Sequence, residues 1–294
     1  MRPSQRARYA ERIERVIRHL GSLEADAPFP RLADLAAIAA YSPFHFHRVF
    51  RLMTGETLGE AVRRIRLARS LPALSAEDMS VTSAAGLSGY ATSQGYARAL
   101  RACTEMSPSE ARRSQAAASE LNAALARSPS SGLPGRPPMS VEVVSIDPFK
   151  VVAIRNVGDH SELNLAYERL FANLFSRIGI ERLRGIYGIP IDDPATLPAD
   201  QCHFDCAVLI DGELDETSDL RMLELGGGLH ARLRHTGPLD HIQATIDRLY
   251  ETVLDAADIR LAEAPPHIHY LDDPDQVPEH RLRADIFLPI EKGR

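Results

Sequence analysis

The sequence predicts two domains: an all-α domain with two helix-turn-helix units, followed by an α+β domain of two pseudo-symmetric β-β-α-β-β repeats. Three observations lead to this prediction. Apolar residues recur at helical spacing through the first 113 residues, in two helix-turn-helix patterns. A stretch rich in Pro, Ser and Gly follows at 127–138 and is typical of a linker. The remaining residues alternate apolar and polar as strands do, and they repeat at a nearly constant offset.

Length and composition agree with two soluble domains. A chain of 294 residues exceeds one ordinary domain, and a hydrophobic content of 44% suffices for real cores. No run of 18 apolar residues is present, so we expect no membrane span, and the basic N-terminus lacks the apolar run of a signal peptide. Three cysteines do not make a disulfide framework, which fits a reducing cytoplasm.

The net charge of −6 is divided unevenly along the chain. Residues 1–127 hold 18 arginines, no lysine and 12 acidic residues, a net charge of +6. Residues 128–294 hold 16 basic and 28 acidic residues, a net charge of −12. A basic half beside an acidic half predicts that only the first half meets a polyanion.

The first helix-turn-helix unit is predicted at 34–50, behind a packing helix at 6–20. Ser42 can cap and Pro43 can start its second helix, which runs to about Met53. Three apolar residues of this helix fall at i, i+3 and i+4 and should be buried: Phe46, Val49 and Phe50. Three polar residues should then face solvent: His47, Arg48 and Arg51.

The second unit is predicted at 81–100, after an arginine-rich linking helix at 57–70 and a loop at 71–78. Gly89-Tyr90 makes its turn, and its second helix runs over about 92–103 with Tyr96 and Leu100 in the core. The run MSPSEARR at 106–113 should close the domain with a capped turn. Two such units would place their second helices in successive major-groove segments, roughly 34 Å apart.

The run SPFHFHRVFRLMTGETLGEAVRRIRLARS, with SAAGLSGYATSQGYARALRACTEMSPSEARR after it, resembles the DNA-binding domain of AraC-type (AraC/XylS) transcription regulators over about 6–113. The resemblance implies seven DNA-facing residues: Phe44, His47, Arg48, Ser93, Gln94, Gly95 and Arg98. Helical spacing adds Arg51 to these DNA-binding candidates. The second unit departs from the pattern at three places. Leu100 stands in place of an aromatic residue, and Ser83/Ala84 stand in place of an aliphatic pair. Gly95 destabilises its helix by about 1 kcal/mol. We therefore expect the first unit to carry more of the sequence readout.

The side chains suit the chemistry of a DNA groove. Arg48 and Arg98 can donate a fork to guanine or neutralise a phosphate, and Gln94 can pair with adenine. Phe44 can touch a thymine methyl group, and His47 can donate to a base or a phosphate.

The second half is an internal repeat. IRNVGDHSELNLAYERLF at 154–171 aligns with LRHTGPLDHIQATIDRLY at 233–250, an offset of 79. GIPIDDPATLPADQCHFDCAVLI at 188–210 aligns with IHYLDDPDQVPEHRLRADIFLPI at 268–290, an offset of 80. The first repeat is predicted to have strands near 141–145, 150–157, 184–189 and 203–210 and a helix at 161–178. The second is predicted to have strands near 221–225, 229–235, 266–271 and 283–289 and a helix at 239–256.

Residues 139–290 resemble the gyrase-inhibitor-like (GyrI-like) effector-binding domain found fused to AraC-type regulators. The resemblance implies a groove between the repeats that takes apolar or cationic small molecules. The ligand candidates are Phe171, Tyr187, Tyr250, Ile268, His269 and Tyr270. The family's buried glutamate falls at Ile268, which argues against cation binding and hydrolysis unless Glu168, Asp205 or Asp285 takes its place.

Other chemistry has weaker signals. His267 and His269 share a face of one strand and could form half of a metal site, although a pocket or surface pair is the commoner meaning. Cys202-His203-x-x-Cys206 has no second ligand pair, so no metal and no cofactor is expected. Gly226-Gly227-Gly228 lacks a P-loop lysine and is expected to make a hairpin between strands. No catalytic residue is predicted.

Together these patterns predict a cytoplasmic, non-enzymatic transcription regulator. Residues 1–113 would bind promoter DNA, 114–138 would form a helical tail and linker, and 139–294 would sense a small apolar effector. RNA polymerase is an expected partner, and no membrane is. Two alternatives remain open: a hydrolase activity of the second half, or a second half that is a protein-interaction module without a ligand. The operator, the effector, activation or repression, and the oligomeric state are not predicted.

Overall fold

The computed structural model describes residues 5–23, 30–74, 79–113, 119–120, 122–123, 125, 141–212, 214 and 219–293. These residues form two compact units. One unit, here the helical unit, comprises 10–40 and 53–132. The other, here the sheet unit, comprises 1–9, 41–52 and 133–294. The predicted linker at 114–138 lies mostly outside the described residues.

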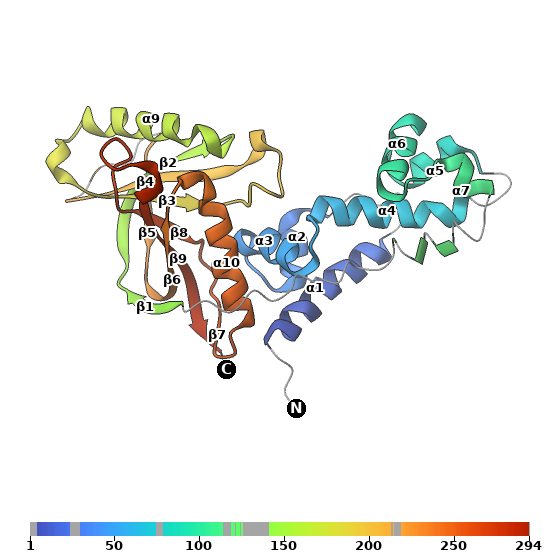
Figure 1. Cartoon of the computed structure of the whole chain (residues 1–294), viewed down its shortest axis with the longest axis horizontal. Coiled ribbons are helices and arrows are strands. Elements are labelled where there is room, and N and C mark those ends of the chain that lie inside the picture. Colours follow the sequence, from blue (N-terminus) through green and yellow to red (C-terminus); the bar gives the residue numbers. More distant parts are fainter. Residues whose placement is uncertain are drawn as a thin grey trace. The chain divides into compact units, whose positions relative to one another are not determined.

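The helices of the first 113 residues follow the predicted order (Figure 1). They are α1 (Gln5–Ser22), α2 (Leu32–Ala39), α3 (Pro43–Thr54), α4 (Leu58–Leu74), α5 (Val81–Leu87), α6 (Ser93–Thr104) and α7 (Pro108–Arg113). The prediction of a loop from residue 71 was wrong, because α4 continues to Leu74 and contains Pro72. Leu71 and Leu74 are buried, and their packing outweighs the hydrogen bond that the proline cannot make.

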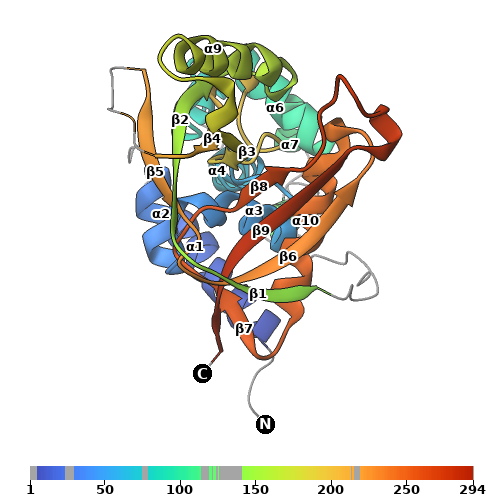
Figure 2. The ribbon, with the colours of Figure 1, turned by 90° about the vertical axis from the view of Figure 1, so that its left-hand side faces the viewer.

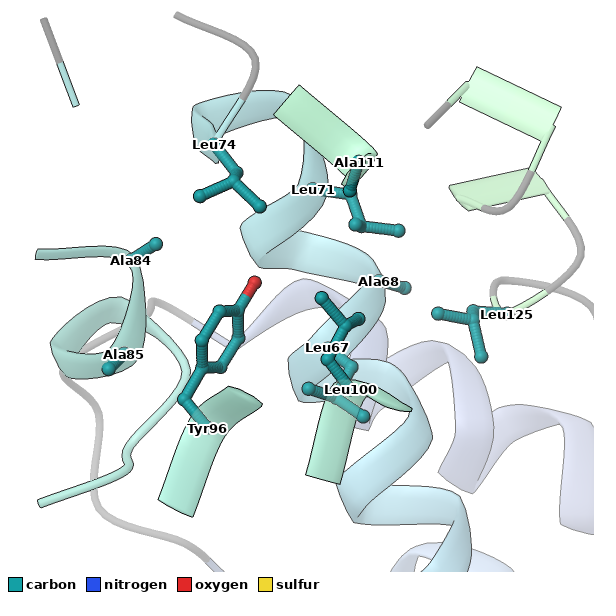
Figure 3. Packing of buried hydrophobic residues seen from close by; sticks show 10 residues of the cluster. All are labelled: Leu67, Ala68, Leu71, Leu74, Ala84, Ala85, Tyr96, Leu100, Ala111 and Leu125. Atoms are coloured by element: carbon teal, nitrogen blue, oxygen red, sulfur yellow. The ribbon is translucent and has the colours of Figure 1, made fainter. Parts of the chain in front are cut away.

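One apolar core holds α4, α5, α6 and α7 together (Figure 3). It contains ten buried residues: Leu67, Ala68, Leu71, Leu74, Ala84, Ala85, Tyr96, Leu100, Ala111 and Leu125. The side chains of Tyr96 and Leu100 are fully buried, as predicted, and the Tyr96 hydroxyl lies 2.9 Å from Ser70 Oγ. The small residues Ala84 and Ala85 let α5 approach α4 closely, so they complete this core rather than weaken it.

Caps and turns fix where the helices of the second unit begin. Thr92 caps α6 by accepting a hydrogen bond from Gly95 N (3.1 Å). Ser107 and Glu110 form the predicted capping box at α7, with each side chain accepting from the other residue's backbone N–H. Gly89 turns the chain between α5 and α6 with φ +71°, a conformation that side chains disfavour.

The sheet unit contains β1 (Glu142–Ile146), β2 (Phe149–Val157), α9 (Leu163–Phe175), β3 (Leu183–Pro190), β4 (His203–Ile210), β5 (Arg221–Leu225), β6 (Gly228–Thr236), α10 (Ile242–Asp255), β7 (Ile259–Leu261), β8 (His267–Tyr270) and β9 (Arg283–Lys292). Short 3-10 turns lie at 160–162, 180–182, 199–201, 239–241 and 279–281. The strand order is β1-β6-β9-β8-β3-β4-β2-β5, and β7, which was not predicted, pairs with β9.

Two bent segments, β1–β2 and β5–β6, connect opposite ends of the strand order (Figure 2). β1 and β2 follow each other through Asp147-Pro148, yet they lie near opposite ends of the strand order, as β5 and β6 also do. β1 pairs with β6 and β2 pairs with β5, so both bent segments turn at the same corner. The predicted hairpin at Gly226-Gly227-Gly228 was therefore wrong, because β5 and β6 do not pair with each other.

The corner depends on glycine. Gly226 has φ +77°, and a Cβ there would lie 2.4 Å from the carbonyl oxygen of Asp147. Gly227 has φ +79° but only Pro148 nearby, at 3.9 Å. Its N–H donates to Ile146 O at 2.9 Å, which ties the two bent segments together at the turn.

The internal repeat appears in matched contacts. The two repeats meet where β3 pairs with β8 in antiparallel register. In each repeat an arginine binds an aspartate on the neighbouring strand: Arg155 with Asp205, and Arg234 with Asp285. In each repeat an aspartate also accepts from the first N–H of the last strand: His203 N to Asp192 (2.9 Å), and Arg283 N to Asp272 (2.8 Å). No described helix is long and apolar enough to cross a membrane.

Candidate DNA-binding and ligand-binding sites

The inner face of α3 packs as predicted, but its other face does not point to solvent. Phe46, Val49 and Phe50 are fully buried. Arg48 is only 3% exposed and His47 only 7% exposed, which contradicts the prediction that both face solvent. Residues 41–52 belong to the sheet unit, and groups of that unit cover them.

Arg48 and Arg51 bind acidic side chains of the sheet unit. Arg48 Nη1 donates to Asp247 Oδ1, and its Nη2 donates to Gln243 Oε1 at 2.9 Å, both on α10. Arg51 donates to Asp193 through Nε (2.8 Å) and to both carboxylate oxygens of Asp247 through Nη2 (2.9 Å each). Both terminal nitrogens of Arg48 are therefore committed, and its guanidinium also lies 5.6 Å from the centre of the Tyr250 ring.

His45 anchors α3 from its buried side, and the sequence offered no signal for this role. Its Nε2 lies 2.8 Å from the carbonyl oxygen of Ala262, and its Nδ1 lies 2.6 Å from the Tyr250 hydroxyl. A carbonyl oxygen only accepts, so Nε2 carries the proton and Nδ1 accepts from Tyr250. Burial lowers the pKa of His45 to about 4, so the ring is neutral at pH 7.

The DNA candidates of α6 lie on a more open helix. Gln94 and Arg98 are exposed and four residues apart, so they share one face. Ser93 and Gly95 are half-buried at the start of the helix, where Gly95 serves the Thr92 cap. Phe44, at the start of α3, is also half-buried.

The structure brings only two of the six ligand candidates together. Tyr187 on β3 and His269 on β8 are register partners, and their rings stack at 4.5 Å. Ile268 and Tyr270 alternate to the opposite face of β8, where Tyr270 meets Tyr167 of α9 at 6.0 Å. Phe171 of α9 also contacts Tyr167, at 6.3 Å, and stacks on Phe175. Tyr250 lies elsewhere and contacts His45.

Further rings join Tyr187 and His269 on their face of the sheet. We call this set the ring cluster: Phe149, Tyr187, His230, His267, His269 and Phe287. His267 stacks on Phe287 (5.0 Å), lies edge-on to His230 (5.3 Å) and lies 6.2 Å from Phe149. In a flat sheet, β8 and β2 would be about 14 Å apart, because three strand spacings separate them. His267 on β8 nevertheless contacts Phe149 on β2. The sheet must therefore curve toward these rings, which places the cluster on its concave face. The sequence indicates His267 only as half of a possible metal site with His269. Among the described residues, no group of three metal-binding side chains occurs.

The carboxylates that could have replaced the missing glutamate are already neutralised. Asp205, 1% exposed, accepts from Arg155 (2.5 and 2.8 Å) and from Arg221 (2.6 Å). Asp285, 4% exposed, is bound by Arg234 and has Arg232 at 3.8 Å. Glu168 is exposed on α9. These buried acids balance arginines and hold strands together, so they leave no surplus negative charge for a cationic ligand.

The two buried cysteines are unsuited to nucleophilic chemistry. Cys202 and Cys206 are buried, and burial raises the pKa of the Cys206 thiol to about 12. A thiol with that pKa is protonated at pH 7, and the thiolate is the nucleophilic and metal-binding form. Cys103 is exposed on α6 and has neither a histidine nor an acid beside it in the helix sequence.

Comparisons with known proteins agree with this architecture. Residues 35–114 match a helix-turn-helix domain family, and residues 139–291 match the GyrI-like small molecule binding domain family. The chain is 32% identical over 105 residues to the probable transcriptional regulator YgiV of Escherichia coli K12, covering 35% of this chain and 66%, just under two thirds, of that protein. It is 32% identical over 78 residues to the transcriptional activator AarP of Providencia stuartii, covering 26% of this chain and 58% of AarP.

A solved structure of an EcmrR–DNA complex in EcmrR-RPo has a chain that matches 52% of this chain over 58% of its own length, with 14% identity and a TM-score of 0.46. The two family matches confirm the fold class of a helical helix-turn-helix region followed by a sheet-rich domain. Because the GyrI-like match spans more than half of its residues, the chain belongs to the family of proteins with a GyrI-like small molecule binding domain.

Proposed function

We propose that the protein is a transcription regulator in which the GyrI-like domain withholds a DNA-reading helix until a small molecule binds. One observation carries the proposal: Arg48 and Arg51, which the sequence assigns to DNA contact, bind Asp247 and Asp193 of the sheet unit. The two matched domain families support it, as do relatives named as a probable transcriptional regulator and a transcriptional activator.

The contacts of α3 and contacts to DNA exclude each other. A guanidinium uses the same planar N–H donors to bind a carboxylate of the protein as it uses to bind a DNA phosphate or the edge of a guanine. In the arrangement described here, Asp247 and Gln243 occupy the terminal nitrogens of Arg48. Asp247 of α10 and Asp193, which follows β3, therefore act as competitors of DNA for this helix. The acidic balance of residues 128–294 suits that role.

Control by a ligand then follows from differential binding. A small molecule shifts the protein toward an arrangement with α3 released only if it binds that arrangement more tightly. A tenfold difference in affinity corresponds to about 1.4 kcal/mol. The GyrI-like domain supplies both the ligand-binding fold and the residues that hold α3, so the two events can be coupled within one unit.

The test is DNA affinity with one competitor weakened. Replacing Asp247 by Asn keeps its shape and removes the charge that Arg48 and Arg51 share, so we expect the full chain to bind a DNA site selected from a random pool about tenfold more tightly. Asp240→Asn removes the same charge from an exposed position just before α10 and should change affinity less than twofold. Fluorescence anisotropy of labelled DNA measures both.

Equal affinities for the Asp247→Asn variant, the control and the wild type would mean that α3 is not withheld. Arg48→Ala then distinguishes the remaining possibilities. If α3 reads DNA, this variant binds the selected site about 1–3 kcal/mol more weakly, with relaxed base preference. RNA polymerase contact and a cytoplasmic location belong to the same proposal and are supported by the DNA-binding fold.

A further inference from the structure

Two imidazole nitrogens inside the ring cluster have no hydrogen-bond partner among the residues that the structure describes. The cluster lies on the concave face of the sheet, where His230 on β6 and His267 on β8 meet edge-on. His230 is 2% exposed and His267 is 1% exposed. Among the described residues, no group hydrogen-bonds to Nε2 of either ring. A buried polar atom without a partner costs about 1–3 kcal/mol, so such an atom calls for an explanation.

The neighbours of His230 determine what its free nitrogen can do. Its Nδ1 lies 3.0 Å from the carbonyl oxygen of Gly228. A carbonyl only accepts, so Nδ1 carries the proton and Nε2 presents a lone pair. Burial lowers the pKa of His267 to about 3 and also lowers the pKa of His230, so both rings are neutral at pH 7. The pair therefore offers hydrogen bonding without charge.

The surroundings select a flat apolar partner. Phe287 and Phe149 flank His267, and the stacked pair of Tyr187 and His269 extends the same surface. Phe149 and His269 are partly exposed, so the cluster reaches from the surface to the buried nitrogens. The nearby aspartates are neutralised by arginines, so they give no preference for a cation.

We propose that His230 and His267 hold the hydrogen-bond donor of a neutral aromatic ligand of the phenol or aryl amine class, whose ring lies among Phe149, Tyr187 and Phe287. The donor of such a ligand meets the lone pair of His230 Nε2, and the second imidazole holds the same polar group. The inference rests on the proposed function, because it names the class of effector that the GyrI-like domain binds.

A matched pair of ligands tests the proposal on the full chain. 2-Naphthol and 2-methoxynaphthalene share one ring system, but only the first has a donor. We expect calorimetric titration to show at least tenfold tighter binding of 2-naphthol. A naphthyl trimethylammonium ion, with the same ring system and a fixed positive charge, should bind no better than 2-methoxynaphthalene.

Histidine variants then locate the contact. His230→Phe and His267→Phe keep a ring at each position and remove the nitrogens, so each should abolish the preference for 2-naphthol while the methoxy compound binds at least as well. His280→Phe, at an exposed position, should keep the preference. Circular dichroism checks that each variant is folded, and phenylalanine suits a buried apolar site.

Three results would overturn the inference: no binding of 2-naphthol, equal binding of both naphthalenes by the wild type, or a preference that survives in both histidine variants. A fourth result would also overturn the inference: the wild type binds zinc but not 2-naphthol, and both histidine variants lose zinc binding. That result would assign the histidine pair to a metal. The Asp247→Asn experiment uses no ligand, so failure here and failure of the proposed regulation can be told apart.

Discussion

Acid should unfold the sheet unit through histidines that it buries in neutral form. His267 has a pKa of about 3 in the folded chain and His45 a pKa of about 4, because both rings are buried. An exposed histidine in the unfolded chain titrates near 6.5. Below that pH the unfolded state binds more protons than the folded state. The stability is therefore complete above pH 6.5 and is lost as the pH falls toward 4 and 3.

The expected loss is large compared with the stability of a domain. At pH 5, about 1.5 pH units below the unfolded pKa, each of the two histidines remains neutral in the folded state. Each therefore lowers the free energy of unfolding by about 2 kcal/mol, since one pH unit is worth about 1.36 kcal/mol per proton. Together they remove about 4 kcal/mol, where domains commonly have 5–15 kcal/mol in total.

The assay is urea unfolding of the full chain at pH 7 and pH 5, followed by circular dichroism. His267→Phe cannot take up a proton, so it should reduce the loss between the two pH values by about 2 kcal/mol. His280→Phe, at an exposed position, should leave the loss unchanged. If His267→Phe loses as much stability on acidification as the wild type, then burial does not keep His267 neutral and the argument for an uncharged histidine pair fails.

Four other substitutions test the corner, the core and the second reading helix. Gly226→Ala should cost about 3 kcal/mol or more in urea unfolding, because a Cβ there would lie 2.4 Å from Asp147 O. Gly227→Ala has a similar φ and only an ordinary contact with Pro148 at 3.9 Å, so it should cost about 1–2 kcal/mol. Equal losses would contradict the described corner. Leu100→Ala should cost about 2–5 kcal/mol, read from denaturation of the helical unit, and a loss below about 1 kcal/mol would exclude its place in the core. Arg98→Ala should weaken binding to the selected DNA by about 1–3 kcal/mol in anisotropy, and unchanged affinity would remove α6 from the interface.

Local patterns predicted the helices and their buried faces. Spacing alone placed Phe46, Val49 and Phe50 of α3 and Tyr96 and Leu100 of α6 in the core, and all five are buried. The reason is that a helix buries residues at i, i+3 and i+4 whatever it packs against. The end of α4 was missed because helical spacing does not show that a helix continues through Pro72, whereas the packing of Leu71 and Leu74 in the folded unit does.

The repeat was also visible in the sequence, but its strand partners were not. The offset of about 80 residues predicted two units of the same order, and the paired arginine–aspartate contacts agree with it. The glycine run at 226–228 resembled a hairpin because glycines and flanking strands are a local signal. Which strand β5 pairs with depends on β2, some 70 residues earlier in the chain, and no local pattern encodes that choice.

Most helices and strands, the two domain families and the residue types suited to DNA followed from the sequence, because periodicity, caps and motifs are properties of neighbouring residues. Only the tertiary structure decided what covers those residues. Arg48 looked exposed on its helix, yet it binds Asp247, which lies 199 positions away in the chain. In the same way, His230 and His267 come from different strands, and their rings lie edge-on at 5.3 Å only in the folded sheet. Burial and pairing between distant segments depend on how the whole unit packs, so both the withheld arginine and the neutral histidine pair became visible only in the fold.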